Sequence, residues 1–202
     1  HAGSNRVLID GEPTELKLGL GTKGAMRAII RTDGVAAHSA YPDLGDSAIT
    51  KLVALLHELP SLVLPHDDLL GATTINVGQI EGGIADNVIA PSAEARIMVR
   101  LVSDADAVWR MLETWVAGRA TLERGSLVPA MRLSSVPGFE TTIVAFATDV
   151  PELTRWGKPY LYGPGSIHVA HTSHERVTRA ELLAAVDGYV KLAEAALAID
   201  RP

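Results

Sequence analysis

The order of strand-like and helix-like stretches between residues 25 and 134 constrains the fold of this chain most. Six stretches follow one another as strand, helix, strand, strand, helix and strand: 25–32, 46–59, 72–80, 94–101, 104–118 and 126–134. Pro60 ends the first helix, and Ser103 is the expected N-cap of the second. The order β-α-β-β-α-β predicts a complete ferredoxin-like domain over residues 25–134.

The flanking residues follow another pattern. Short strand-like runs occur at 6–10, 16–20, 142–148 and 158–162, with helical patterns at 151–156 and 179–199. Strands mixed with helices in this way are typical of an α/β layer. We therefore predict an α/β fold in which a partial α/β layer, formed by residues 1–24 and 135–202, is interrupted by the ferredoxin-like domain.

Composition excludes several classes of function. The 18 basic and 24 acidic residues give a net charge of −6, which does not provide the basic field that nucleic acids or anionic membranes need. The chain has no cysteine, so a metal must be bound by His, Asp or Glu, and a reducing cytoplasm is the expected location. We expect no membrane span, because charges interrupt every apolar run.

The beginning of the chain carries no targeting pattern. Residues 1–6 lack the basic and then apolar layout of a signal peptide, and no initiating Met is present. This favours a start inside a longer gene product, or after removal of a tag.

A glycine pattern at residues 19–24, GLGTKG, formally matches the GxGxxG fingerprint for dinucleotides. That fingerprint requires a helix to begin at the glycines, so that the helix N-terminus can bind a pyrophosphate. Because a strand pattern follows instead, we interpret these glycines as a flexible connection between the domains.

Three histidines, His168, His171 and His174, are spaced three residues apart after a Gly-Pro-Gly turn. In a helix, neighbouring pairs would share one side and could hold zinc. The intervening Val169 and Thr172 are weak helix formers, however, so a three-histidine zinc site is a minor alternative.

Glu12 directly follows a predicted strand, as does the loop over residues 168–175. Ligands of open α/β sheets bind beyond the carboxyl ends of the strands, so we expect these two segments to converge on one site. His38 lies on a loop between a strand and a helix, where functional residues are frequent.

Five short motifs occur in the order known from one enzyme family. They are GEPT at residues 11–14, AHSAYP at 37–42, GG with NVI at 82–89, GPGS at 163–166, and AHT with Glu175 at 170–175. Together they resemble the zinc-dependent amidohydrolases and peptidases that include acetylornithine deacetylase, succinyl-diaminopimelate desuccinylase and aminoacylase. The run GPGSI and the nearby Ala-His are most similar to the acetylornithine deacetylase branch.

The resemblance implies a catalytic α/β domain with two zinc ions, cobalt being an alternative, and an inserted ferredoxin-like domain that forms a homodimer. It implies that Glu12 and His171 each bind one metal ion, and that His38 reaches the partner's active site and polarises the scissile carbonyl. It further implies contacts of Asn87, Arg100 and Gly165 with the substrate, a small N-acyl amino acid.

The chain departs from the family in two respects, and the smaller is that position 174 is His where many relatives have an acidic residue. The upstream half of the family, which supplies the remaining metal ligands and the general-base glutamate, has no counterpart here, because GEPT stands at the start. Since one protein ligand cannot hold a zinc ion, we expect the chain to be the C-terminal portion of an amide hydrolase and inactive by itself. A peptidase of the same family and a non-catalytic dimerisation or regulatory module are the alternatives.

Overall fold

The computed structural model describes residues 6–199, so the interpretation of residues 1–5 lies outside the described part. The chain forms two compact units. Unit 1 combines the chain up to Lys23 with the chain from Ala130 onward, and unit 2 is Gly24–Pro129. Both units combine strands with helices, which confirms the predicted α/β class.

Unit 2 contains a four-stranded antiparallel sheet in the order β6-β7-β3-β8. Its elements are β3 (Gly24–Asp33), α1 (Ala48–Glu58), β6 (Thr74–Gly82), β7 (Ser92–Leu101), α2 (Ala105–Val116) and β8 (Thr121–Val128). A small ladder of β4 (His66–Asp67) and β5 (Gly71–Ala72) lies between α1 and β6 along the chain. Element order and strand order are those of a ferredoxin-like domain.

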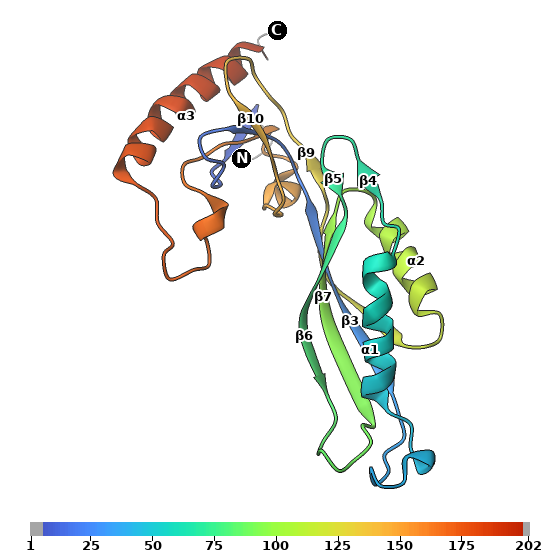
Figure 1. The fold of residues 1–202 in the computed structure, drawn as a ribbon. Coiled ribbons are helices and arrows are strands. Elements are labelled where there is room, and N and C mark those ends of the chain that lie inside the picture. Colours follow the sequence, from blue (N-terminus) through green and yellow to red (C-terminus); the bar gives the residue numbers. More distant parts are fainter. Residues whose placement is uncertain (1–5, 200–202) are drawn as a thin grey trace. The chain divides into compact units, whose positions relative to one another are not determined.

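Both helices of unit 2 cover the same face of the sheet (Figure 1). Alternate residues of β3 and β7 point into this layer, where Leu52 of α1 and Leu112 of α2 are fully buried. Helix α2 corrects one prediction, because its N-cap is Asp104 and not Ser103. The Asp104 carboxylate accepts a hydrogen bond from the Ala107 N–H at 2.8 Å, the three-residue reach typical of an N-cap.

The last strand of unit 2 was predicted too late in the sequence. The strand lies at Thr121–Val128 instead of 126–134, and the two-residue strand β9 (Met131–Arg132) belongs to unit 1. Strand β8 is an edge strand in which the charged residues Glu123 and Arg124 interrupt the apolar alternation, so its pattern is weak.

Unit 1 contains a mixed sheet in the order β1-β11-β2-β10, with β9 paired to β2. The strands are β1 (Val7–Asp10), β2 (Leu18–Thr22), β10 (Thr141–Val144) and β11 (Lys158–Leu161). The glycines expected to form a flexible connection lie in β2 and at the start of β3. A Cβ atom at Gly19 would lie 2.9 Å from the Leu161 side chain, so the glycine permits close packing of β2 and β11.

Helix α3 (Arg179–Ile199) begins and ends where the sequence predicts, whereas residues 151–156 contain only a short 3-10 helix, Val150–Leu153. One face of α3 packs through Leu192 and Ala196 against Tyr160. The outer face of α3 exposes apolar side chains: Leu182, Leu183, Val186, Val190, Leu197 and Ile199. Among the described residues, no helix is long and apolar enough to cross a membrane.

Candidate functional site

The candidate site lies at the edge of unit 1 where two neighbouring strands end. Strands β1 and β11 are parallel, and their last residues, Asp10 and Leu161, are partners in the ladder. The Tyr162 N–H continues the pairing by donating to the Asp10 carbonyl at 3.1 Å. The segments 11–14 and 163–166 therefore leave the sheet side by side, and 163–166 leads into the loop over residues 168–175 that is expected to converge with Glu12.

Thr14 connects the segments 11–14 and 163–166 through hydrogen bonds of its hydroxyl. Its side chain is almost fully buried, and its hydroxyl accepts from the Gly163 N–H at 3.0 Å and donates to the Lys17 carbonyl at 2.6 Å. One residue later, the Glu15 N–H donates to the Gly165 carbonyl at 3.0 Å. Glu12 and Gly165 are thus positioned by one continuous hydrogen-bonded arrangement.

The backbone at this edge is tightly packed and strained. A Cβ atom at Gly163 would lie 2.4 Å from the Glu12 carbonyl oxygen, so only glycine fits there. Glu15 and Leu16 have φ angles of 56° and 61°, and Gly165 has a φ of 80°. Left-handed conformations cost free energy in residues with a side chain, and such strain clusters at functional sites.

Negative charge collects around Glu12. Burial raises the pKa of the Glu12 carboxyl, and repulsion by Asp10 and Asp149 raises it further. Burial and Asp149 also raise the pKa of Asp10, while the Gly11 N–H opposes this shift. One carboxylate oxygen of Asp10 is buried and has no hydrogen-bond partner among the described residues. These three carboxylates favour a positively charged ligand at this edge.

His171 lies on an exposed loop that borders the same region. Its φ angle is 62°, and its backbone N–H donates to the Glu175 carboxylate at 2.8 Å. A hollow of about 330 Å³ lies between this loop and the two segments after β1 and β11. Its lining includes Pro13, Gly165, Ala170 and Glu175. The structure therefore brings Gly165 and the loop of His171 to one hollow.

A complete metal site is absent from residues 6–199, which contain no group of three metal-ligating side chains. The histidines at 168, 171 and 174 accordingly do not assemble into the three-ligand site weighed above. Zinc sites take three or four protein ligands. Glu12 and His171 offer one donor each, so these residues alone do not fit a zinc ion.

His38 and Asn87 meet at one end of unit 2, although 48 residues separate them in the sequence. The N–H of Ser39 donates to the Asn87 carbonyl at 2.9 Å, and His38 forms a β-bridge with Val88. The His38 ring accepts the Ala40 N–H at Nδ1, at 3.1 Å. In a neutral ring this leaves the proton on Nε2, which is then free to donate to a substrate carbonyl.

Arg100 lies away from this end of unit 2. It is the ninth residue of β7, about 26 Å along the strand from Ser92, which is the first residue.

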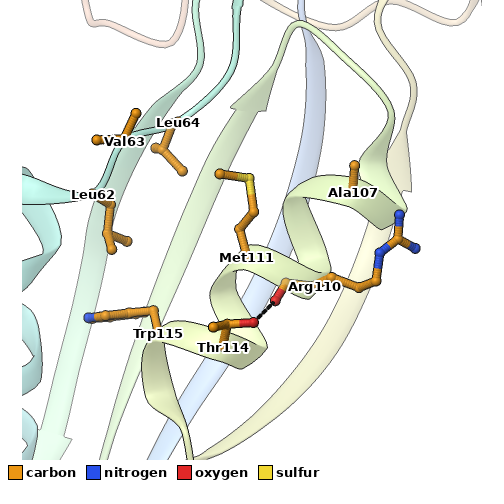
Figure 2. Close-up of a pocket in the computed structure, with 8 residues that line it drawn as sticks. All are labelled: Leu62, Val63, Leu64, Ala107, Arg110, Met111, Thr114 and Trp115. Carbon is orange, nitrogen blue, oxygen red and sulfur yellow. Dashed lines mark hydrogen bonds between the residues drawn. The ribbon is translucent and has the colours of Figure 1, made fainter.

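A hollow of about 540 Å³ on the helical face of unit 2 involves none of the predicted site residues (Figure 2). Leu62, Leu64, Met111 and Trp115 contribute to its apolar walls.

Sequence reasoning did not identify all residues that shape the candidate site. The sequence marks Thr14 only as part of the motif GEPT and Asp10 only as the end of a strand, and no local pattern marks Asp149. The Tyr189 hydroxyl, which lies 3.1 Å from the position of a Cβ at Gly163, supports the two segments from α3. No local pattern marks Tyr189, because its contact depends on how α3 packs.

Several known proteins are similar to this chain in sequence. Residues 20–121 match the M20 family model described as a peptidase dimerisation domain. A probable carboxypeptidase of Paracoccidioides lutzii is 40% identical over 97% of this chain and 50% of its own length. An M20 peptidase domain protein of Schizosaccharomyces pombe is 40% identical over 92% of this chain and 47% of its own length. The chain thus spans about half the length of these curated relatives.

Solved structures show the same fold. Aminopeptidase PepT of Bacillus cereus superposes with a TM-score of 0.71 over 96% of this chain and 57% of its own, at 18% identity. An amidase of the hydantoinase/carbamoylase family from Burkholderia phymatum also gives 0.71, over 96% of this chain and 55% of its own, at 14% identity.

Proposed function

Because the chain belongs to the M20 metallopeptidase family, we propose that the complete protein is a cytoplasmic amide hydrolase and that this chain builds part of its active site. The observation that carries the proposal is the meeting of residues 11–14 and 163–166 at one sheet edge, beside a hollow and an excess of negative charge. Glu12 and His171 would each supply one ligand to one of two zinc ions, with the other ligands coming from residues outside this chain.

The proposed substrate is a small N-acyl amino acid, as in the deacetylases whose motifs the chain resembles. Peptides are the second candidate, favoured by relatives named as carboxypeptidases. An N-acyl amino acid and a peptide C-terminus both present an amide next to a carbon that bears a free carboxylate. Gly165 would receive this carboxylate, and Nε2 of His38 would donate to the scissile carbonyl of substrate bound by a second copy.

The α/β layer of unit 1 supports the view that further residues belong to the active protein. Leu183, Val186 and Val190 on the outer face of α3 are 60%, 58% and 54% exposed. Exposed apolar faces of this kind are normally covered by other parts of the same protein or by a partner. The chain also spans only about half the length of its curated relatives.

The test is zinc titration combined with hydrolysis of N-acetyl-ornithine and of a dipeptide. We expect the complete protein to bind two zinc ions and cleave the amide, and this 202-residue chain to do neither. In the complete protein, Glu12→Gln should lower kcat/KM about a hundredfold or more. The matched control, Glu15→Gln, changes an exposed carboxyl that interacts with Ser166 and Lys17, and should stay within about threefold. Turnover by this chain alone would overturn the proposal, and cleavage of the dipeptide alone would select the second candidate.

We also propose that unit 2 forms a homodimer through the free edge of β6, since the family model that it matches is a dimerisation domain. Among residues 6–199, strand β6 pairs with β7 alone, so its other edge offers backbone groups without a strand partner. Ile80 on β6 and Ile84 after it are 58% and 72% exposed. Ile49 of α1 lies against Gly82 and Gly83 at the end of β6, which extends the apolar edge.

Replacing Ile80 by lysine should weaken dimerisation about tenfold or more, because a charge would be buried at the centre of the apolar edge. Sedimentation equilibrium of the complete protein measures this effect. Val63→Lys is the control: Val63 is 86% exposed on the helical face and its change should leave the dimer intact. A dimer unaffected by Ile80→Lys would place the interface elsewhere.

A further inference from the structure

The open face of the unit 2 sheet, opposite α1 and α2, carries a row of arginines. Register places Arg27 of β3 directly opposite Met98 of β7. The residues two positions before and after Met98 are Arg96 and Arg100, and they share its face. Arg27 is therefore the diagonal neighbour of two arginines, at a Cα separation of about 7–8 Å.

The carboxylates on this face do not compensate Arg27. Glu94 pairs with Arg31 at 3.1 Å and with Arg96 at 3.0 Å, and Glu123 pairs with Arg31. Within the described chain, the Arg27 guanidinium has no carboxylate within 4 Å. Like charges on neighbouring strands repel each other, so an anion bound near Arg27 would be stabilising. This local excess of positive charge contrasts with the net charge of −6 of the whole chain.

The sheet is hollowed where Arg27 lies. Strand β6 has an irregularity at Gly78, between Val77 and Gln79, and β8 has one beside Arg27, where Gly125 lies. Both glycines border a trough of about 450 Å³, together with Arg27, Gln79, Arg96 and Met98. A Cβ atom at Gly125 would lie 3.1 Å from Cβ of Arg27, so the glycine keeps this part of the trough open.

The chemistry of the trough selects its ligand. Bulges leave backbone polar groups without ladder partners, and the Gln79 amide adds a donor and an acceptor. The planar guanidinium of Arg27 matches a carboxylate in bidentate geometry. Ile29 and Met98 supply an apolar floor next to the Arg27 guanidinium. A phosphate dianion would need more donors and would not use the apolar floor.

We propose that this trough is a binding site for a small organic carboxylate with an apolar body. The carboxylate lies at Arg27, assisted by Arg96, and the apolar part lies over Ile29 and Met98. The volume of the trough is within the range of about 300–1,000 Å³ found for small-molecule sites. The carboxylate can belong to a free acid or to the C-terminus of a peptide.

Isothermal titration calorimetry of this 202-residue chain with N-acetyl-leucine tests the proposal. We expect saturable binding that is lost with N-acetyl-leucinamide, which lacks the carboxylate, and that weakens at least tenfold in Arg27→Gln. The control, Arg110→Gln, removes an exposed arginine of α2 on the other side of the sheet and should bind as the unchanged chain does. A leucyl-leucine arm distinguishes the sources: tighter binding than N-acetyl-leucine assigns the site to peptide C-termini, and weaker binding assigns it to free acids.

Three results would overturn the proposal. They are equal binding of the amide, unchanged binding in Arg27→Gln with circular dichroism showing an intact fold, and inorganic phosphate binding as tightly as N-acetyl-leucine. Binding that survives Arg27→Gln would belong to another part of the chain. The result does not depend on zinc or on turnover, so it stands or fails separately from the proposed hydrolase activity.

Discussion

Gly163→Ala is expected to destabilise unit 1 by about 3 kcal/mol, the upper part of the range for overpacking. The added Cβ would lie 2.4 Å from the Glu12 carbonyl oxygen, and that oxygen belongs to backbone held by Thr14. The strain can be relieved only if the segment bearing Glu12 moves. Urea unfolding followed by circular dichroism measures the loss of stability, and in the complete protein we expect activity to fall in parallel.

Gly11→Ala is the matched control for this experiment. It makes the same change in the segment that carries Glu12, but its Cβ would meet only the Tyr189 hydroxyl, at 3.2 Å. The far end of a side chain can shift by a few tenths of an ångström, so we expect a loss of at most about 1 kcal/mol. Equal effects of the two substitutions would show that the close approach at Gly163 is not the cause.

Leu112→Ala should destabilise unit 2 by about 2–5 kcal/mol. Leu112 is fully buried between α2 and the sheet, and truncation leaves a cavity among residues from both elements. Unfolding monitored by tryptophan fluorescence reports this change, because Trp115 lies one turn further along α2.

Met111→Ala provides the comparison on the same helix. Met111 precedes Leu112 but is 39% exposed and borders the hollow shown in Figure 2. Its truncation removes a similar side-chain volume without creating an enclosed cavity, so the expected loss is within about 1 kcal/mol. A loss as large as that of Leu112→Ala would mean that the helical face is more tightly packed than the structure indicates.

The sequence predicted elements wherever periodicity was strong. Helix α3 has the predicted bounds, and the six elements of unit 2 occur in the predicted order. The prediction was wrong where tertiary contacts, and not the local pattern, decide the secondary structure. Gly19 looked like part of a flexible connection, but it allows β2 to pack against Leu161. The edge strand β8 was predicted too late in the sequence, because Glu123 and Arg124 interrupt its alternation of apolar and polar residues.

For the candidate site too, some features could be predicted from the sequence and others could not. The rule that ligands gather beyond strand ends predicted that the segment of Glu12 converges with the loop over residues 168–175. The parallel pairing of β1 and β11 brings residues 163–166, which lead into that loop, beside the segment of Glu12. The roles assigned to Glu12, His171, His38, Asn87, Arg100 and Gly165 stay predictions. The repulsion among Glu12, Asp10 and Asp149 could not be predicted, because Asp149 is remote in sequence and reaches them only through the fold.

The pairing of strands at the boundary between the units has a consequence for how such a chain can change over evolutionary time. Thr22 pairs with Met131 in unit 1, and Ala25 pairs with Val128 in unit 2. The chain thus leaves unit 1 and returns to it through neighbouring positions, where the Cα atoms of paired residues are about 5 Å apart. A two-residue hairpin turn spans that distance. The intervening hundred or so residues can therefore be gained, lost or exchanged as a cassette in a single genetic event, while the sheet on the other side keeps its register.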